Sequence, residues 1–232
     1  MSKLNLNLRS VDVQKDLRNC YDLHRTVLSA YPQLDSENKK ARDVFNVLYR
    51  LDNSSASDRL DLLVQSESKP DWSKLPQHYV TYSSQNTPNI EVKDISHVFD
   101  TIKNGMCLRF RIRANATKKT NTSLKKDRLE GRKNNGTRIP ILKTDEQIKW
   151  ITNKSKLHGF DIVSVKNLPD VNISNTGISK GRKTDKILTF NSVVFEGILA
   201  INDTVVFSDT LKKGIGSAKA FGFGLLSIAP AK

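Results

Sequence analysis

Tyr21 and His24 are the two side chains of this sequence best suited to acid–base chemistry. They stand three residues apart in a segment with helical apolar periodicity, so one face of a helix would present both of them. Histidine titrates closest to neutral pH and can therefore donate or accept a proton there. The same periodicity places His24 inside an apolar stripe that runs from Val13 to Leu28. On these residues alone, a buried structural histidine is a stronger interpretation than a catalytic one.

A second candidate site lies near the C-terminus, in residues 214–224, which we call the glycine loop. Its pattern is G-x-G-x5-G-x-G, and a short apolar run follows it. Glycine adopts positive φ at little cost, so successive N–H groups can point into one concavity that binds phosphate beside a lysine. A flexible loop, or glycines that let two backbones touch, explains the same pattern. The residues concerned are Gly214, Gly216, Lys219, Gly222 and Gly224.

The other histidines, His78, His97 and His158, stand in unlike contexts and are interpreted as structural or surface residues. No spacing of Cys, His and carboxylate residues typical of a metal site is present in the sequence, and neither is a P-loop or a nucleophilic-serine motif. The sequence therefore predicts no metal ion and no cofactor.

The positive charge of the chain is concentrated in one segment. The net charge is +14, but residues 1–108 hold 14 Lys or Arg and 14 Asp or Glu, which cancel. Residues 109–143 hold 12 basic residues against two acidic ones. Nucleic acid is the commonest partner of such a segment. A membrane surface would require an apolar face that this segment lacks.

Two basic stretches are predicted to contact nucleic-acid phosphates. The first is a strand at 109–114, where arginine and apolar residues alternate, with the polar loop 115–138 after it. The second lies within 172–186, which is predicted to be the tip of a hairpin. For the loop, a solvated charge run without a ligand is the alternative. The cations predicted to bind nucleic acid, which is RNA if the family resemblance described below holds, are Arg109, Arg111, Arg113, Lys118, Lys119, Lys125, Lys126, Arg132, Lys133, Arg138, Lys180, Arg182 and Lys183.

Residues 1–102 are predicted to form the first of two α+β units. Strands are expected at 3–8, 44–51 and 60–64, with a last strand within 92–102. One amphipathic helix is expected from Val13 to Pro32, and residues 70–76 are expected to form a loop or one helical turn. This order of strands and helices is that of a ferredoxin-like fold.

Residues 103–232 repeat that order. Strands are expected at 109–114, 160–168, 187–201 and 225–229. Thr144 is expected to cap a helix that ends near Leu157, and Asp203 to begin a shorter helix that ends near Lys213. The predicted fold class is therefore α+β, with two tandem ferredoxin-like (RRM-like) domains.

Four stretches, in one order, resemble the CasE family, which supplies the RNA-processing subunit of type I-E Cascade complexes. They are Tyr21-Asp22-Leu23-His24-Arg25 with Tyr31-Pro32; Leu108-Arg109-Phe110-Arg111-Ile112-Arg113-Ala114-Asn115; Gly136-Thr137-Arg138-Ile139-Pro140-Ile141; and Phe195-Glu196-Gly197-Ile198-Leu199 with Asn202-Asp203. The glycine loop that follows is similar to the loop that closes the family's fold. Ala116 stands where the family's basic strand usually continues with Pro, a departure that bears only on the local turn.

The resemblance implies a metal-independent endoribonuclease with a cleft between its two domains. It would cut CRISPR repeat RNA at the base of the hairpin and remain bound to the product beside other Cascade subunits. The catalytic His and Tyr of the family fall on His24 and Tyr21. A protein of the same fold that binds structured RNA without cutting it is the alternative function.

The cellular compartment follows from simple features. Cys20 and Cys107 are too few and too far apart for a disulfide framework, and the longest apolar runs fall short of a bilayer span. The first residues lack the apolar core of a signal peptide. A cytoplasmic protein without a membrane partner is expected.

Overall fold

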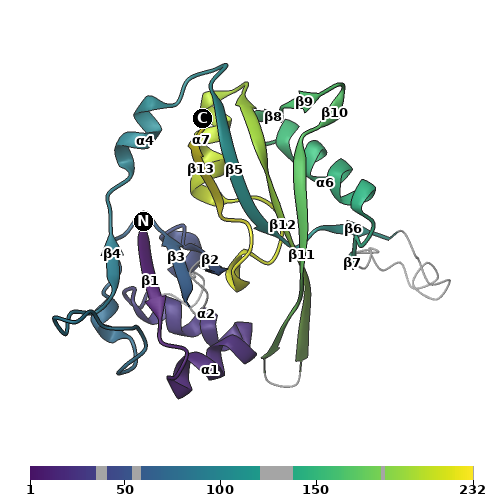
Figure 1. The fold of residues 1–232 in the computed structure, drawn as a ribbon. Helices are drawn as coiled ribbons and strands as arrows, with labels where there is room; N and C mark the ends of the chain where they lie inside the picture. The colour runs from purple at the N-terminus through teal and green to yellow at the C-terminus, as the bar shows by residue number, and fades with distance from the viewer. Residues whose placement is uncertain (35–40, 54–58, 121–137, 184–185, 232) are drawn as a thin grey trace.

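The computed structural model describes residues 1–34, 41–53, 59–120, 138–183 and 186–231 of the chain. These residues form two α+β units, each built on an antiparallel sheet (Figure 1). Within the described residues, the structure contains no helix of the length and apolarity needed to cross a bilayer.

The N-terminal unit has the strand order β2-β3-β1-β4, in which every neighbour is antiparallel. This is the order of a ferredoxin-like fold, as the sequence predicts. Its strands are β1 (Ser2–Leu6), β2 (Leu48–Asn53), β3 (Leu60–Gln65) and β4 (Ile90–Val92). Its helices are α1 (Val11–Arg18), α2 (Cys20–Ser29), the single turn α3 (Ala41–Val44) and the 3₁₀ turn η1 (Trp72–Lys74).

The single helix expected from Val13 is in fact two helices, so that prediction is wrong. Asn19 has extended backbone dihedrals, with φ −134° and ψ 101°, and separates α1 from α2. Its side chain accepts a hydrogen bond from the backbone N–H of Tyr21 and thereby caps α2. The break lets α2 begin in a new direction, and α2 is the helix that carries Tyr21 and His24.

The last strand of this unit was expected within 92–102, and that expectation is also wrong. β4 ends at Val92, and α4 (Ser96–Thr101) follows it. Asp94 starts the turn because its Oδ1 accepts a hydrogen bond from the backbone N–H of Ser96 at 2.8 Å. Phe99 and Ile102, three residues apart, then pack against the core of the C-terminal unit. The strand expected at 44–51 also differs at both ends, since β2 begins at Leu48, after α3, and ends at Asn53.

The C-terminal unit has the strand order β11-β12-β5-β13, with β8 paired to the end of β12. This is a second ferredoxin-like sheet. Its strands are β5 (Cys107–Ala114), β8 (Phe160–Ile162), β11 (Val171–Lys183), β12 (Lys186–Ile201) and β13 (Leu226–Pro230). Its helices are α6 (Thr144–Lys156) and α7 (Thr204–Lys213). Two short antiparallel pairs complete the unit. They are β6 (Thr117–Lys119) with β7 (Arg138–Pro140), and β9 (Ser164–Val165) with β10 (Leu168–Pro169).

Three predictions in this unit need correction. The strand expected at 160–168 is split into β8, β9 and the start of β10. Residues 172–186 are predicted to be a hairpin tip, but strand β11 extends to Lys183, which pairs with Lys186 of β12. Thr144 is the first residue of α6 and not its cap, whereas Asp203 caps α7 by accepting hydrogen bonds from Val205 and Val206.

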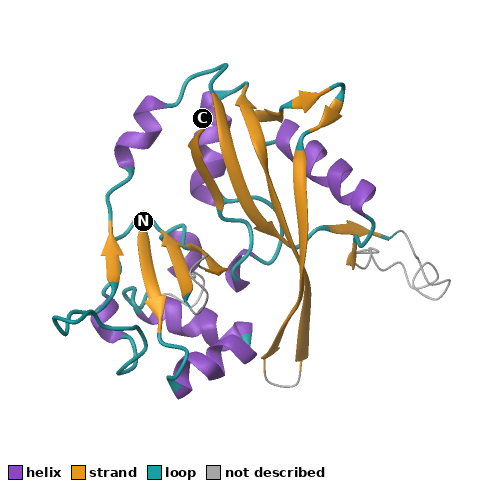
Figure 2. Cartoon of the chain, in the orientation of Figure 1, coloured by secondary structure: helices purple, strands orange, loops and turns teal. Residues whose placement is uncertain are grey.

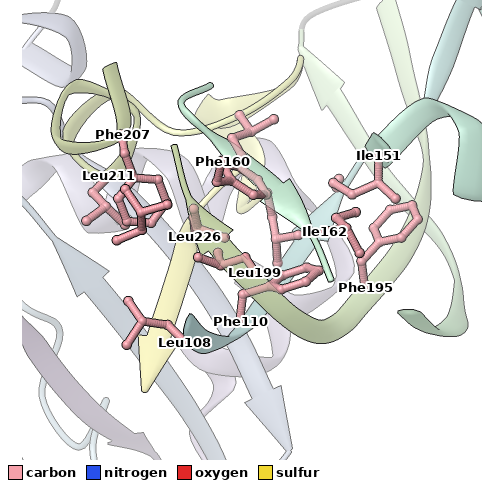
Figure 3. Packing of buried hydrophobic residues seen from close by; sticks show 14 of the residues in the cluster. Leu108, Phe110, Ile151, Phe160, Ile162, Phe195, Leu199, Phe207, Leu211 and Leu226 are labelled. Carbon is pink, nitrogen blue, oxygen red and sulfur yellow. The ribbon is translucent and has the colours of Figure 1, made fainter. Parts of the chain in front are cut away.

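The core of the C-terminal unit lies between its sheet and the two helices α6 and α7 (Figures 2 and 3). Phe110 and Ile112 of β5 point into this core, which contains Ile151 from α6 and Phe207 from α7. The arginines that alternate with them lie on the opposite face of β5, as the sequence predicts. The N-terminal unit has its own core, which includes Leu4, Leu23, Val27, Tyr49 and Leu62.

Polar side chains of the N-terminal unit hold the two units together. Arg50 on β2 is only 2% exposed, and its guanidinium donates to the carbonyl oxygens of Arg111 and Leu225 at 3.1 and 3.2 Å. Asp52 neutralises it through two hydrogen bonds of 2.8 Å. The Gln65 side chain donates to the carbonyl oxygen of Leu211 at 2.6 Å. A buried cation with this many partners fixes the orientation of one sheet on the other.

Arg50→Met tests this contact. The substitution keeps an apolar stem, removes the donor from the carbonyl oxygens of Arg111 and Leu225, and leaves Asp52 with only the more distant guanidinium of Arg111. We expect the free energy of unfolding to fall by about 3 kcal/mol, which corresponds to a Tm roughly 6–12 °C lower. Arg59→Met is the matched control, since Arg59 is exposed on the same unit and its loss should change the Tm little. Equal melting temperatures for the two variants would contradict the assignment.

Candidate active site

A cleft of about 1230 Å³ lies between α2 and the glycine loop. The N-terminal unit supplies one wall and the C-terminal unit supplies the other. From α2 come Tyr21, His24, Arg25 and Leu28, and from the glycine loop come Gly216, Ala218, Lys219, Ala220 and Phe221. The structure therefore brings together the two candidate sites that the sequence identified about 200 residues apart.

His24 and Tyr21 lie on the face of α2 that borders this cleft. Leu23 and Val27 on the same helix are buried in the core of the N-terminal unit, whereas His24 and Tyr21 are half-buried. The ring centroids of Tyr21 and His24 are 6.4 Å apart. His24 thus stands at the margin of the apolar stripe, where its ring is within reach of the cleft.

Phe221 of the glycine loop packs against His24 across the boundary between the two units. The ring centroids are 5.8 Å apart and the planes are inclined at 60°, an edge-to-face contact. Phe221 also stacks on Phe190 of β12, at 5.0 Å. The histidine ring is therefore held between its own helix and an aromatic wall that belongs to the other unit.

Tyr49 of β2 fixes the turn that carries Phe221. The turn is the 3₁₀ segment η2 (Lys219–Phe221), bounded by left-handed residues, Ala218 with φ 62° and Gly222 with φ 81°. The buried Tyr49 hydroxyl donates to the carbonyl oxygen of Ala220 at 2.8 Å. Burial holds the pKa of this phenol well above its usual value, so the hydroxyl keeps the proton that it donates.

Two glycines of the loop are required by backbone contact. Gly214 has φ 71° and Gly224 has φ 86°. A Cβ at Gly214 would lie 2.6 Å from the carbonyl oxygen of Gly224, and one at Gly224 would lie 2.6 Å from that of Ile215. The N–H groups of Ile215 and Gly224 donate to the carbonyl oxygens of Gly224 and Arg113. Close approach of two backbones therefore accounts for this pair, and a phosphate-binding role for the loop stays a prediction centred on residues 216–222.

Lys219 extends along the wall of the cleft, and one of its ammonium protons is engaged. Its Nζ donates to the carbonyl oxygen of Lys213 at 2.7 Å. Burial, and secondarily the positive charge of Arg42, lower the pKa of Lys219 from its usual value. Because an ammonium group has three donors, this lysine can still donate to a second group in the cleft.

The three arginines of β5 lie in different environments. Arg109 is exposed. Arg111 approaches Asp52 at 3.7 Å and Glu196 at 3.4 Å. Arg113 is half-buried, donates to the Ser192 hydroxyl at 2.7 Å and lies 4.8 Å above the ring of Phe223, and burial lowers its pKa. These contacts give Arg113 a structural role at the boundary of the two units, in addition to the RNA contact predicted for it.

The remaining predicted RNA-binding cations are spread over the C-terminal unit. Lys118 forms an ion pair with Glu146 at 2.7 Å, Lys119 is exposed, and Arg138 donates to the Thr117 hydroxyl at 3.3 Å. Lys180 and Arg182 are exposed on β11, and the backbone of Lys183 ends that strand. Lys125, Lys126, Arg132 and Lys133 lie outside the described residues.

Two residues of the cleft are not predicted from the sequence. Arg42 lines the cleft, and Tyr49 supports its wall through the bond to the Ala220 carbonyl oxygen. Tyr49 has the sequence context of an ordinary strand residue, so the sequence carries no signal for its contact with Ala220.

The other histidines do not line this cleft. His78 and His97 are exposed, and His158 pairs with the Thr210 hydroxyl at 2.9 Å. In the part of the chain that the structure describes, no group of three or more His, Cys, Asp or Glu side chains could hold a metal ion.

Comparison with known proteins identifies relatives over the whole chain. Residues 1–230 match the family described as CRISPR associated protein. The CRISPR-associated endoribonuclease Cse3 of Thermus thermophilus is 30% identical, with 99% of each chain covered, and the Cascade subunit CasE of Escherichia coli is 29% identical, with 92% of this chain and 93% of that protein covered.

Solved structures agree in fold. A structure of Cse3 bound to a 19-nucleotide RNA superposes with a TM-score of 0.77 at 29% identity, covering 99% of both chains. A structure of Thermus thermophilus Cse3 with an RNA that represents a pre-cleavage complex has the same TM-score at 28% identity and covers 99% of this chain and 98% of that one. The Escherichia coli protein Cas6e, at 23% identity, has a TM-score of 0.62 and full coverage of both chains, which supports the fold.

The contact role of Gly224 can be separated from its unusual φ angle. Gly224→Ala introduces both a left-handed alanine and a clash with the carbonyl oxygen of Ile215. Gly105→Ala is the matched control, because Gly105 has φ 80° with no atom within 4 Å of the added Cβ. We expect Gly105→Ala to cost about 1–2 kcal/mol of unfolding free energy and Gly224→Ala at least about 3 kcal/mol. Denaturation by urea measures both, and equal losses would show that the two backbones do not require the glycine.

Proposed function

The chain belongs to the family of CRISPR-associated proteins that includes Cse3 and CasE, and from this premise we propose that it is an endoribonuclease that processes CRISPR repeat RNA. Its substrate is the precursor transcript, cut within each repeat at the base of the hairpin. Its product is guide RNA, to which it remains bound as a subunit of a Cascade complex. The proposal places the protein in the cytoplasm, which agrees with the free thiols of Cys20 and Cys107.

One observation carries the catalytic part of the proposal. Tyr21 and His24 of α2 border the same cleft as Lys219 and Phe221 of the glycine loop. Cleavage of RNA without a metal ion requires a base, an acid and a group that stabilises negative charge on the phosphate. These residue types are present on opposite walls of one cleft, in a chain whose relatives carry the name endoribonuclease.

The reaction that we propose uses the RNA's own 2′-hydroxyl as nucleophile. The O2′ atom attacks the adjacent phosphorus while the bond from phosphorus to the 5′-oxygen of the next nucleotide breaks. The proton of the 2′-hydroxyl passes to a base in the cleft, and an acid in the cleft supplies a proton to the leaving oxygen. The products are a 2′,3′-cyclic phosphate and a 5′-hydroxyl, so atoms and charges balance without a water molecule or a cofactor.

His24 is the residue that we assign to proton transfer, because imidazole serves as acid or base near neutral pH. Phe221 restricts the rotation of its ring by packing against one edge. Tyr21 orients or assists through its hydroxyl from the preceding turn of the helix. Lys219 supplies positive charge to the phosphate, and its ammonium group is held in place because it donates to the carbonyl oxygen of Lys213.

RNA binding is assigned to exposed cations of the C-terminal unit. Arg109 on β5 and Lys180 and Arg182 on β11 expose their side chains. Such contacts hold the phosphate backbone in position and contribute little to sequence recognition. The basic segment 115–138 contributes further positive charge to this unit by its sequence, and most of it lies outside the described residues. Discrimination among repeats then depends on unpaired bases and on the shape of the stem.

The catalytic assignment predicts a separation of cleavage from binding. His24→Ala should lower the single-turnover cleavage rate of the repeat hairpin by about 100-fold or more, the usual contribution of a positioned acid or base. Its affinity for the hairpin should stay within a few-fold, because neutral histidine adds little attraction to phosphate. Tyr21→Phe should cost less than His24→Ala, since it removes one hydroxyl. EDTA should leave the wild-type rate unchanged.

His97→Ala is the matched control, because His97 is exposed on α4. It should cleave at the wild-type rate. A wild-type protein that binds the hairpin tightly and never cuts it would instead establish the RNA-binding alternative. Loss of activity in EDTA, restored by a divalent cation, would replace the proposed mechanism with a metal-dependent one.

A further inference from the structure

The long hairpin of the C-terminal unit depends on α2 for support at its far end. β12 pairs with β5 only from Val193 onward, so residues 178–183 and 186–191 pair with each other alone. We call this two-stranded extension the arm. A two-stranded hairpin is marginally stable without packing against another element. Figure 1 shows the arm extending from the large sheet toward the N-terminal unit, where its end comes near α1 and α2.

Asn19 joins the arm to the first turn of α2. Its Oδ1 accepts hydrogen bonds from the backbone N–H of Tyr21 at 3.2 Å and from that of Arg182 at 2.9 Å. Its Nδ2 donates to the Asp22 carboxylate at 2.8 Å and makes a longer contact of 3.5 Å with the carbonyl oxygen of Arg182. One side chain therefore caps the helix of Tyr21 and pairs with the backbone of the arm.

Gly181 makes this contact possible. A Cβ at this position would lie 2.6 Å from the Cys20 Sγ, 3.2 Å from the Asn19 Oδ1 and 3.3 Å from the Tyr21 backbone nitrogen. The φ angle of Gly181 is not positive, so the position requires glycine for space and not for backbone conformation. The strand consequently touches the helix at the residues that begin it.

We propose that Asn19 is a positioning residue for RNA cleavage, which fixes the start of α2, and hence Tyr21 and His24, against the arm. The inference rests on the proposed function, because it takes Tyr21 and His24 as the catalytic pair. The arm exposes Lys180 and Arg182, which are proposed to hold RNA phosphates. Asn19 thus ties the backbone that holds the substrate to the helix that acts on it. The phenylalanine contact between Phe190 and Phe221 supports the same arm nearer its base.

Asn19→Ser is the direct test. Serine caps helices about as well as asparagine, but its shorter side chain does not reach the backbone of Arg182. We expect the single-turnover cleavage rate at saturating enzyme to fall about tenfold, because small displacements of a catalytic group are costly. The affinity for the hairpin product should stay within twofold of the wild-type value. Asp203→Ser is the matched control, since it alters the cap of α7. The Asp203 carboxylate accepts hydrogen bonds from the backbone N–H groups of Val205 and Val206, and this cap is not part of the contact with the arm.

A second pair of variants tests the same contact if Asn19→Ser folds poorly. Gly181→Ala should separate the arm from α2 and lower the cleavage rate by at least the same factor. Cys20→Ala combined with Gly181→Ala should restore part of the rate, because it removes the sulfur that the added methyl group meets first.

His24→Ala, measured in parallel, separates this inference from the proposed function. If His24→Ala abolishes cleavage while Asn19→Ser and Gly181→Ala cleave at the wild-type rate, the positioning role is wrong and the proposed function stands. A loss of affinity in Asn19→Ser as large as the loss of rate would also overturn it. If His24→Ala cleaves like the wild type, the catalytic pair is misassigned and the positioning role falls with it.

Discussion

The buried guanidinium of Arg50 is the interaction on which the candidate site depends. The cleft has one wall from each ferredoxin-like unit, so its geometry is only as well defined as the contact between them. Arg50 reaches from β2 to carbonyl oxygens of β5 and of the segment just before β13, while Asp52 balances its charge. The adjacent residue, Tyr49, holds the Ala220 carbonyl oxygen. Two consecutive residues of one strand therefore set the second unit, and its glycine loop, relative to the helix that carries His24.

The glycine loop shows how one motif serves structure and function in different parts. Gly214 and Gly224 let the two ends of the loop touch, as their blocked Cβ positions demonstrate. Between them, the turn of Lys219 and Phe221 projects into the cleft. The close backbone contacts at the two ends of the loop keep this turn in place. A preorganised turn of this kind suits a site that must bind a charged phosphate without rearranging. The catalytic role of the turn remains part of the proposal.

Local patterns in the sequence were enough to predict much of the fold. The alternation of Arg109, Arg111 and Arg113 with apolar residues gave β5 its two faces, and Asp203 marked the start of α7. The break at Asn19 is not evident from periodicity, because the apolar stripe continues through it and its bond to the backbone of Arg182 spans 163 residues. The sequence favours a strand within Val92 to Ile102, whereas Phe99 and Ile102 pack at helical spacing on the core of the other unit, a contact that local patterns do not reveal. The apolar stripe from Val13 to Leu28 likewise predicts a buried His24. In the structure His24 borders a cleft, which forms only where the two units meet.

The central claim is that cleavage uses the RNA's own 2′-hydroxyl within the cleft between α2 and the glycine loop. The most direct measurement replaces one ribose, just upstream of the mapped cleavage site, with 2′-deoxyribose and follows binding and cleavage by the wild-type protein at saturating enzyme. The account predicts normal affinity for this RNA, no cleavage of it, and a 2′,3′-cyclic phosphate on the product of the all-ribose RNA. Cleavage of the deoxy-substituted RNA at the all-ribose rate would contradict it.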